Sequence, residues 1–226
     1  MELFKCDGLT KHKGDFCLKD VSFSFPKGRI VGLLGKDGFG KTTLIKTILG
    51  SYGIDQNAND AGDLWMDGHN FKDDPKEYRS GIGFVLLDNP FDNSMTPAEV
   101  GETYGYYYND FDMDKYLKYL EEFDLPLKSA GAQLTGGQIM KLQMVFSLSH
   151  PTKLLLLDEP YYYIDSDFRF FFYDTIRSMA DSGEGSVIFS SRSAVQLTIL
   201  TDDMILLKRT GNVSTAEFFG RDSDSE

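Results

Sequence analysis

The chain has few cysteines and no long apolar run, and each shortage excludes a class of protein. Its two cysteines, Cys6 and Cys17, provide neither a disulfide framework nor the paired spacing of a metal site. They favour reduced thiols in a cytosolic protein. Apolar runs such as Leu154–Leu157 are far shorter than the ~20 residues that span a bilayer. Charged residues at Glu2 and Lys5 precede any apolar run, so we expect no signal peptide.

Positive charge is also scarce. The 226 residues include 23 Lys and Arg against 35 Asp and Glu, a net charge of −12. Nucleic-acid-binding domains usually carry a basic surface, so we expect no nucleic-acid partner. An acidic chain can still bind a polyanion such as a nucleotide if a local site overrides the overall field.

Hydrophobic patterning predicts an α/β fold with strands at both ends of the chain and helices between them. Short apolar runs predict buried strands at 29–34, 82–86, 154–157 and 186–189. Apolar residues spaced i, i+3, i+4 predict helices at 99–107 and 113–123. We therefore assign 1–220 to a single domain. Within it, 1–95 and 151–212 form an α/β core, 96–150 form a helical part, and the acidic tail 221–226 is expected to be disordered.

A glycine-rich turn follows the first buried strand and precedes a predicted helix from Lys41 to Leu49. It matches the P-loop pattern G-x4-G-K-T, in which bare backbone amides surround phosphate oxygens. The lysine supplies a charge to the outer phosphates, and the threonine hydroxyl is a hard oxygen for Mg²⁺. The predicted nucleotide-binding residues are Gly35, Lys36, Asp37, Gly38, Phe39, Gly40, Lys41, Thr42 and Thr43.

Two carboxylates follow the apolar strand at 154–157, at the edge of the sheet where ligands of open α/β proteins bind. We expect Asp158 to reach Mg²⁺ and Glu159 to polarise the water that attacks the terminal phosphate. A further glycine pair precedes a helix and predicts a second backbone anion site, formed by Thr135, Gly136, Gly137 and Gln138. If the two sites do not meet within one chain, a head-to-tail dimer would join them around the nucleotide.

These three motifs, in this order, resemble the nucleotide-binding subunit of ABC transporters. The resemblance extends from Leu9 to about Asn212. Further segments are similar to the bacterial exporter branch that includes bacitracin-resistance and Ytr-type subunits: Tyr108–Asp112, Phe123–Leu125 and Leu148–His150. The family implies a P-loop NTPase with a Rossmann-like ATPase core, an antiparallel β subdomain and a helical subdomain. It also implies ATP and Mg²⁺ as ligands, a homo- or heterodimer of ATPase subunits, and membrane permease subunits as partners. The protein would then lie in the cytoplasm, on the inner face of the cell membrane.

Two departures from the family pattern bear on hydrolysis. The family's Gln after the strand at 82–86 is Leu87 here, which leaves neighbouring Asp88 as a candidate metal ligand. The family's switch histidine is Arg192, which could hold a γ-phosphate but cannot relay a proton. We therefore expect ATP binding with slow hydrolysis, and take Glu159, Lys41 and Arg192 as the catalytic candidates. The alternative is a degenerate ATP-binding half of a heterodimeric transporter or sensor complex.

The role of aromatic residues is open in two places. At the position where the family stacks an aromatic ring on adenine, this chain has Lys13, and Phe16 is a possible substitute. A cluster in the helical part would either pack inside that part, which we favour, or dock a membrane subunit. Its members are Tyr104, Tyr106, Tyr107, Tyr108 and Phe111.

Overall fold

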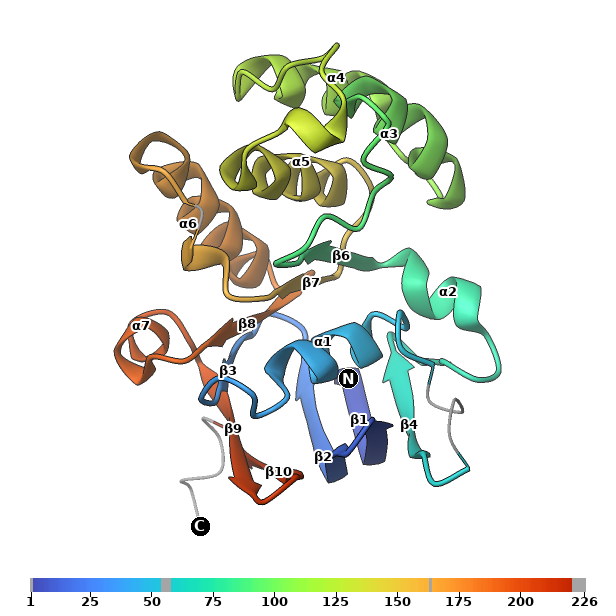
Figure 1. Ribbon diagram of the computed structural model, residues 1–226, viewed down its shortest axis with the longest axis vertical. Helices are drawn as coiled ribbons and strands as arrows, with labels where there is room; N and C mark the ends of the chain where they lie inside the picture. Colours follow the sequence, from blue (N-terminus) through green and yellow to red (C-terminus); the bar gives the residue numbers. More distant parts are fainter. Residues whose placement is uncertain (1, 54–57, 163, 221–226) are drawn as a thin grey trace.

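A computed structural model describes residues 2–53, 58–162 and 164–220 (Figure 1). The predicted acidic tail at 221–226 lies outside the described residues. No helix within the described ranges is both long and apolar enough to cross a membrane.

One mixed sheet runs through the described part of the molecule. The strand order is β5 (His69–Asn70), β4 (Ala61–Met66), β1 (Glu2–Lys13), β2 (Phe16–Pro26), β10 (Val213–Phe219), β9 (Asp203–Thr210), β3 (Ile30–Leu34), β8 (Ser186–Ser191), β7 (Leu154–Leu157) and β6 (Ile82–Val85). From β9 to β6 the strands are parallel, whereas β1, β2, β4 and β5 pair in antiparallel fashion. In Figure 1, β6 and β7 lie next to the helices at the top of the view, and β1, β2 and β4 lie below.

The parallel strands have apolar sequences because helices cover both of their faces. All four residues of β7 and all six of β8 are buried. The strands predicted at 29–34, 82–86, 154–157 and 186–189 are therefore confirmed as β3, β6, β7 and β8. The helices are α1 (Lys41–Ile48), α2 (Pro75–Ser80), α3 (Pro97–Tyr104), α4 (Met113–Glu122), α5 (Gly136–Leu148), α6 (Ser166–Asp181) and α7 (Ala194–Thr198).

Helices α3, α4 and α5 form the upper lobe in Figure 1. Polar side chains of α5 attach this lobe to the edge strand β6. Gln143 exchanges hydrogen bonds with the backbone of Leu86, and Ser147 does the same with Phe84. These bonds satisfy the free edge of β6, whose outer neighbour is helix rather than strand. The helix predicted over 113–123 is confirmed as α4. The one predicted over 99–107 ends earlier, because its last turn is a 3₁₀ helix at Gly105–Tyr107.

The aromatic cluster of the lobe divides between core and surface. Phe111 and Tyr108 pack against buried Phe146, with ring centroids 5.1 and 5.4 Å away. Tyr106 and Tyr107 are instead 86% and 71% exposed. Packing thus accounts for only part of the cluster.

Candidate functional site

The turn between β3 and α1 has the backbone shape that the P-loop sequence predicts. Gly38 and Gly40 have φ angles of 78° and 96°, a region that other residues rarely adopt. A Cβ atom on Gly40 would lie 2.6 Å from the Phe16 ring, so the close packing there also requires glycine. Gly40 precedes the first turn of α1, and the amides of that turn are suited to bind an anion.

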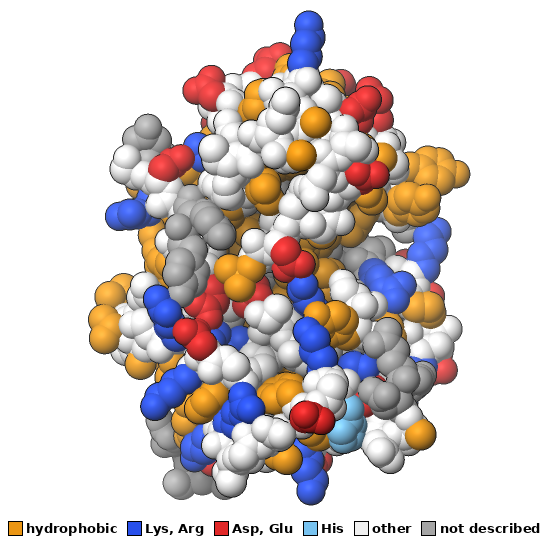
Figure 2. All heavy atoms as spheres, in the orientation of Figure 1, with side chains coloured by type: hydrophobic (Ala, Val, Ile, Leu, Met, Phe, Trp, Pro, Cys, Tyr) orange, Lys and Arg blue, Asp and Glu red, His pale blue; other side chains and the backbone are white. Residues whose placement is uncertain are grey.

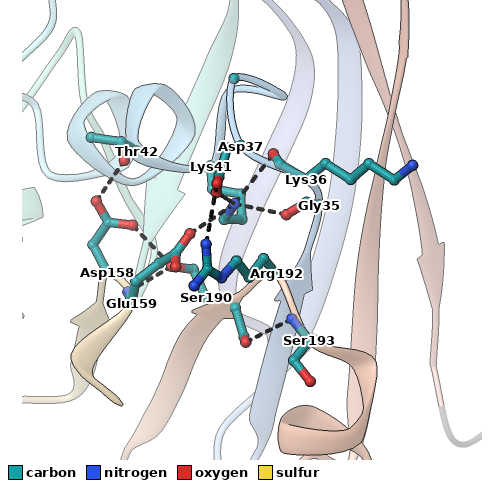
Figure 3. Close-up of polar contacts among 12 residues, drawn as sticks. Gly35, Lys36, Asp37, Lys41, Thr42, Asp158, Glu159, Ser190, Arg192 and Ser193 are labelled. Atoms are coloured by element: carbon teal, nitrogen blue, oxygen red, sulfur yellow. Dashed lines mark hydrogen bonds and ion pairs between the residues drawn. The ribbon is translucent and has the colours of Figure 1, made fainter. Parts of the chain in front are cut away.

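Lys41 lies at the centre of the site and is 5% exposed. Its Nζ donates a 2.7 Å hydrogen bond to the Gly35 carbonyl and lies 2.8 Å from Oε1 of Glu159 (Figure 3). The sequence separates Lys41 and Glu159 by more than a hundred positions, and the neighbouring strands β3, β8 and β7 bring them together. The two residues predicted to face the terminal phosphate therefore share one location.

Asp158 is buried at the end of β7 and accepts hydrogen bonds from two hydroxyl groups. Thr42 Oγ1 donates to one carboxylate oxygen over 2.7 Å, and Ser190 Oγ donates to the other over 2.9 Å. Burial raises the pKa of Asp158 above its usual range, and the hydrogen bonds from Thr42 and Ser190 oppose this shift.

The Ser190 hydroxyl also fixes the backbone of the proposed catalytic base. It accepts a 2.9 Å hydrogen bond from the amide of Glu159, which has a φ of 47°. Sequence reasoning did not single out Ser190. Its signal is positional, because Ser190 lies near the carboxyl end of β8, and β8 pairs with β7 in the same direction.

Thr42 and Asp158 suit a Mg²⁺ ion that also binds phosphate oxygens. Both present hard oxygen ligands, and their oxygens are already neighbours. Within the described part of the chain, no group of three or more His, Cys, Asp or Glu side chains could hold a metal ion. A Mg²⁺ site usually takes one or two protein ligands and is completed by water and substrate phosphates.

Asp88 and Arg192 have other partners. The Asp88 carboxylate lies 2.8 and 2.9 Å from Nζ of Lys46, which holds the pKa of Asp88 below its ordinary value. Arg192 Nη1 lies 3.3 Å from Oδ2 of Asp37, within the P-loop. The structure thus brings Arg192 to the P-loop and pairs Asp88 with a lysine of α1.

The second predicted anion site lies at the start of α5, in the upper lobe (Figure 1). Thr135 caps this helix, and Gln138 accepts a hydrogen bond from the Thr135 amide to complete a capping box. Gly136 and Gly137 form the first turn. Figure 1 shows this lobe apart from the P-loop, so the two predicted anion sites do not meet within the chain.

A pocket of about 300 Å³ opens beside the P-loop and is lined by Phe16, Lys13 and Leu87, among others. Arg209 packs on Phe16, with its guanidinium 5.5 Å from the ring centroid. Lys13 donates a hydrogen bond to the hydroxyl of Tyr52 over 2.8 Å. Phe16 is therefore an aromatic surface next to the phosphate loop, as its proposed role beside adenine requires.

Comparison with known proteins gives consistent matches. A family model described as ABC transporter matches residues 18–162. The chain is 31% identical over 168 residues to the ABC transporter ATP-binding protein YtrB of Bacillus subtilis, covering 74% of this chain and 54% of YtrB. It is 29% identical over 227 residues to the energy-coupling factor transporter ATP-binding protein EcfA1 of Thermotoga maritima, covering 95% of this chain and 82% of EcfA1. The chain thus spans about half the length of YtrB.

The fold also matches solved structures. One is an ATP-binding cassette in a dimeric, post-hydrolysis state bound to ADP and Pi, with a TM-score of 0.75 and 21% identity. The match covers 91% of this chain and 94% of that cassette.

Proposed function

Because the chain belongs to the ATP-binding subunits of ABC transporters, we propose that it binds Mg-ATP at the P-loop and hydrolyses it to drive export through separate membrane subunits. The observation that carries this proposal is the convergence of Lys41, Glu159, Thr42 and Asp158 at one end of the sheet. Fold alone would not carry it, since a P-loop fold supports many activities.

The contacts of Lys41 suggest how the site would respond to nucleotide. Lys41 pairs with Glu159 across 2.8 Å, and a triphosphate competes with that carboxylate for the ammonium group. Phosphate binding would therefore release Glu159, which is then free to accept a proton from the attacking water. Thr42 and Asp158 would hold Mg²⁺, which supplies charge neutralisation to the phosphates when bound.

We further propose a head-to-tail dimer, homo- or heteromeric. The start of α5, with Thr135, Gly136 and Gly137, would contact the nucleotide held by the partner's P-loop. Two features support this assembly: the separation of the two anion sites in one chain, and the dimeric, ADP-bound cassette that shares this fold. The partners would be permease subunits, and the protein would lie on the inner face of the cell membrane.

We expect hydrolysis to be slow. Leu87 lines the pocket next to the P-loop, where a leucine side chain cannot bind a metal ion or orient water. Arg192 stays protonated and cannot accept a proton. These two residues also support the second candidate function, a degenerate ATP-binding half of a heterodimeric transporter or sensor complex.

Turnover measurements on the wild type, Glu159→Gln and Leu87→Gln separate the two functions. A slow ATPase predicts measurable phosphate release that falls at least about 100-fold in Glu159→Gln, while Mg-ATP binding persists. It also predicts faster release in Leu87→Gln. Phosphate release that is equal in the wild type and in Glu159→Gln, with binding intact, would reject hydrolysis and favour the regulatory function.

A further inference from the structure

The phosphate-binding loop of this chain contains an acidic side chain. Asp37 lies in the loop between Gly35 and Gly38, and its Oδ1 is 4.0 Å from Nζ of Lys41. The carboxylate is 71% exposed, and Asp37 lines the pocket beside the P-loop in which a nucleotide would bind. Figure 3 shows this carboxylate in contact with both Lys41 and the guanidinium of Arg192.

A fixed negative charge here opposes the binding of an anion. Two unit charges several ångströms apart in water change a binding constant by a factor of about two to three. A triphosphate carries several charges, and salt screens part of the effect. An uncompensated carboxylate at position 37 would therefore weaken nucleotide binding by roughly three- to tenfold.

Arg192 supplies the compensating charge. It follows β8, and its Nη1 lies 3.3 Å from Oδ2 of Asp37. Acidic and basic side chains are mixed across the middle of the face in Figure 2, over the region of β3 and α7. We propose that Arg192 is a positioning residue that neutralises Asp37 and holds it away from the incoming phosphates. This inference rests on the proposed nucleotide-binding function, and it assigns Arg192 a role through Asp37 rather than through direct phosphate contact.

The chemistry of the pair explains why an arginine suits this position. A guanidinium group is charged at every physiological pH. A neutral histidine would leave the Asp37 charge uncompensated. The arginine is therefore needed because of the acid in the loop, and replacing Arg192 should be more harmful when Asp37 is present than when Asp37 has been removed.

The test is a double-mutant cycle with Mg-ATP and Mg-ADP, measured by calorimetry at low and at moderate salt. We expect Arg192→Ala to weaken binding of both nucleotides roughly three- to tenfold, with the larger loss at low salt. In the Asp37→Asn background, where no carboxylate is left to neutralise, Arg192→Ala should weaken binding by no more than about twofold. Arg192→Lys should retain binding. Lys118→Ala, which removes one exposed charge from α4, is the matched control. Thermal unfolding of each variant checks that it folds.

Three results would overturn the inference. If Arg192→Ala weakens ATP but not ADP, and does so equally in the Asp37→Asn background, then Arg192 contacts the terminal phosphate directly. If Asp37→Asn strengthens binding as much as Arg192→Ala weakens it, the two charges act independently. If the folded wild type binds neither nucleotide, the proposed function itself falls, and this inference with it.

Discussion

Replacing Ser190 by alanine tests how the site is held together. The hydroxyl is fully buried, donates to Asp158 over 2.9 Å and accepts from the amide of Glu159 over 2.9 Å. A hydrogen bond to a charged group contributes about 1.5–3 kcal/mol and a neutral one about 0.5–1.5 kcal/mol. We therefore expect Ser190→Ala to lower the free energy of unfolding by about 2–4 kcal/mol at pH 7.

The same strand offers a matched control. Ser186, near the other end of β8, is also fully buried and makes two hydrogen bonds of 3.1 Å, but both of its partners are backbone groups, of Pro26 and Arg29. Ser186→Ala should cost about 1–3 kcal/mol without altering ATP turnover. Ser190→Ala should in addition reduce turnover, because the Glu159 backbone, with its positive φ, loses the bond that holds it.

The pH dependence separates a site effect from a general loss of stability. Burial raises the pKa of Asp158 in the folded protein, so the folded state gains stability as the pH falls through that raised value. Removing the Ser190 hydroxyl raises the same pKa further. The destabilisation by Ser190→Ala should then be largest near pH 7 and shrink toward pH 4, whereas that of Ser186→Ala should stay constant. Urea unfolding at several pH values measures both. A penalty for Ser190→Ala that is independent of pH would refute the assigned hydrogen bond to the ionised carboxylate.

Three further substitutions probe separate parts of the site. Gly40→Ala should lower the free energy of unfolding by about 1–2 kcal/mol or more and abolish Mg-ATP binding, because φ is 96° and the new Cβ would meet Phe16. Urea unfolding measures the first effect and calorimetry the second. Unchanged Mg-ATP binding would contradict this prediction. Thr42→Val should weaken ATP binding at least about tenfold in the presence of Mg²⁺ but not in EDTA, and Thr42→Ser should bind ATP as the wild type does. Equal losses of affinity with and without Mg²⁺ would show that Thr42 does not bind the metal ion. Thr135→Ala removes the cap of α5, so it should cost about 1 kcal/mol of stability and, in a Glu159→Gln background, reduce ATP-dependent dimerisation in gel filtration. Undiminished dimerisation of this variant would show that the start of α5 does not contact the nucleotide.

The parallel half of the fold was predictable because its strands are buried on both faces and have continuous apolar sequences. The ends of the helices and strands were less predictable. The helix predicted to reach residue 107 changes to 3₁₀ geometry at Gly105, where the Phe111 ring packs so closely that a Cβ would lie 2.6 Å from it. That contact depends on the tertiary fold and leaves no periodic signal in the sequence.

The candidate site was likewise predictable only in part. Local motifs with fixed spacing predicted the P-loop and the carboxylates after β7. Ser190 and the Asp37–Arg192 pair could not be found this way, because they depend on which strand ends lie next to one another. Only the order β3–β8–β7 places the end of β8 between the P-loop and Glu159.

Calorimetric titration of the wild type and of Lys41→Ala with Mg-ATP tests the central claim most directly. The account predicts saturable binding of one nucleotide per chain, and affinity at least about 30-fold weaker in a folded Lys41→Ala variant, since a buried charge contact of about 2 kcal/mol is lost. Equal affinities for the two proteins, or a folded wild type that binds no Mg-ATP, would contradict it.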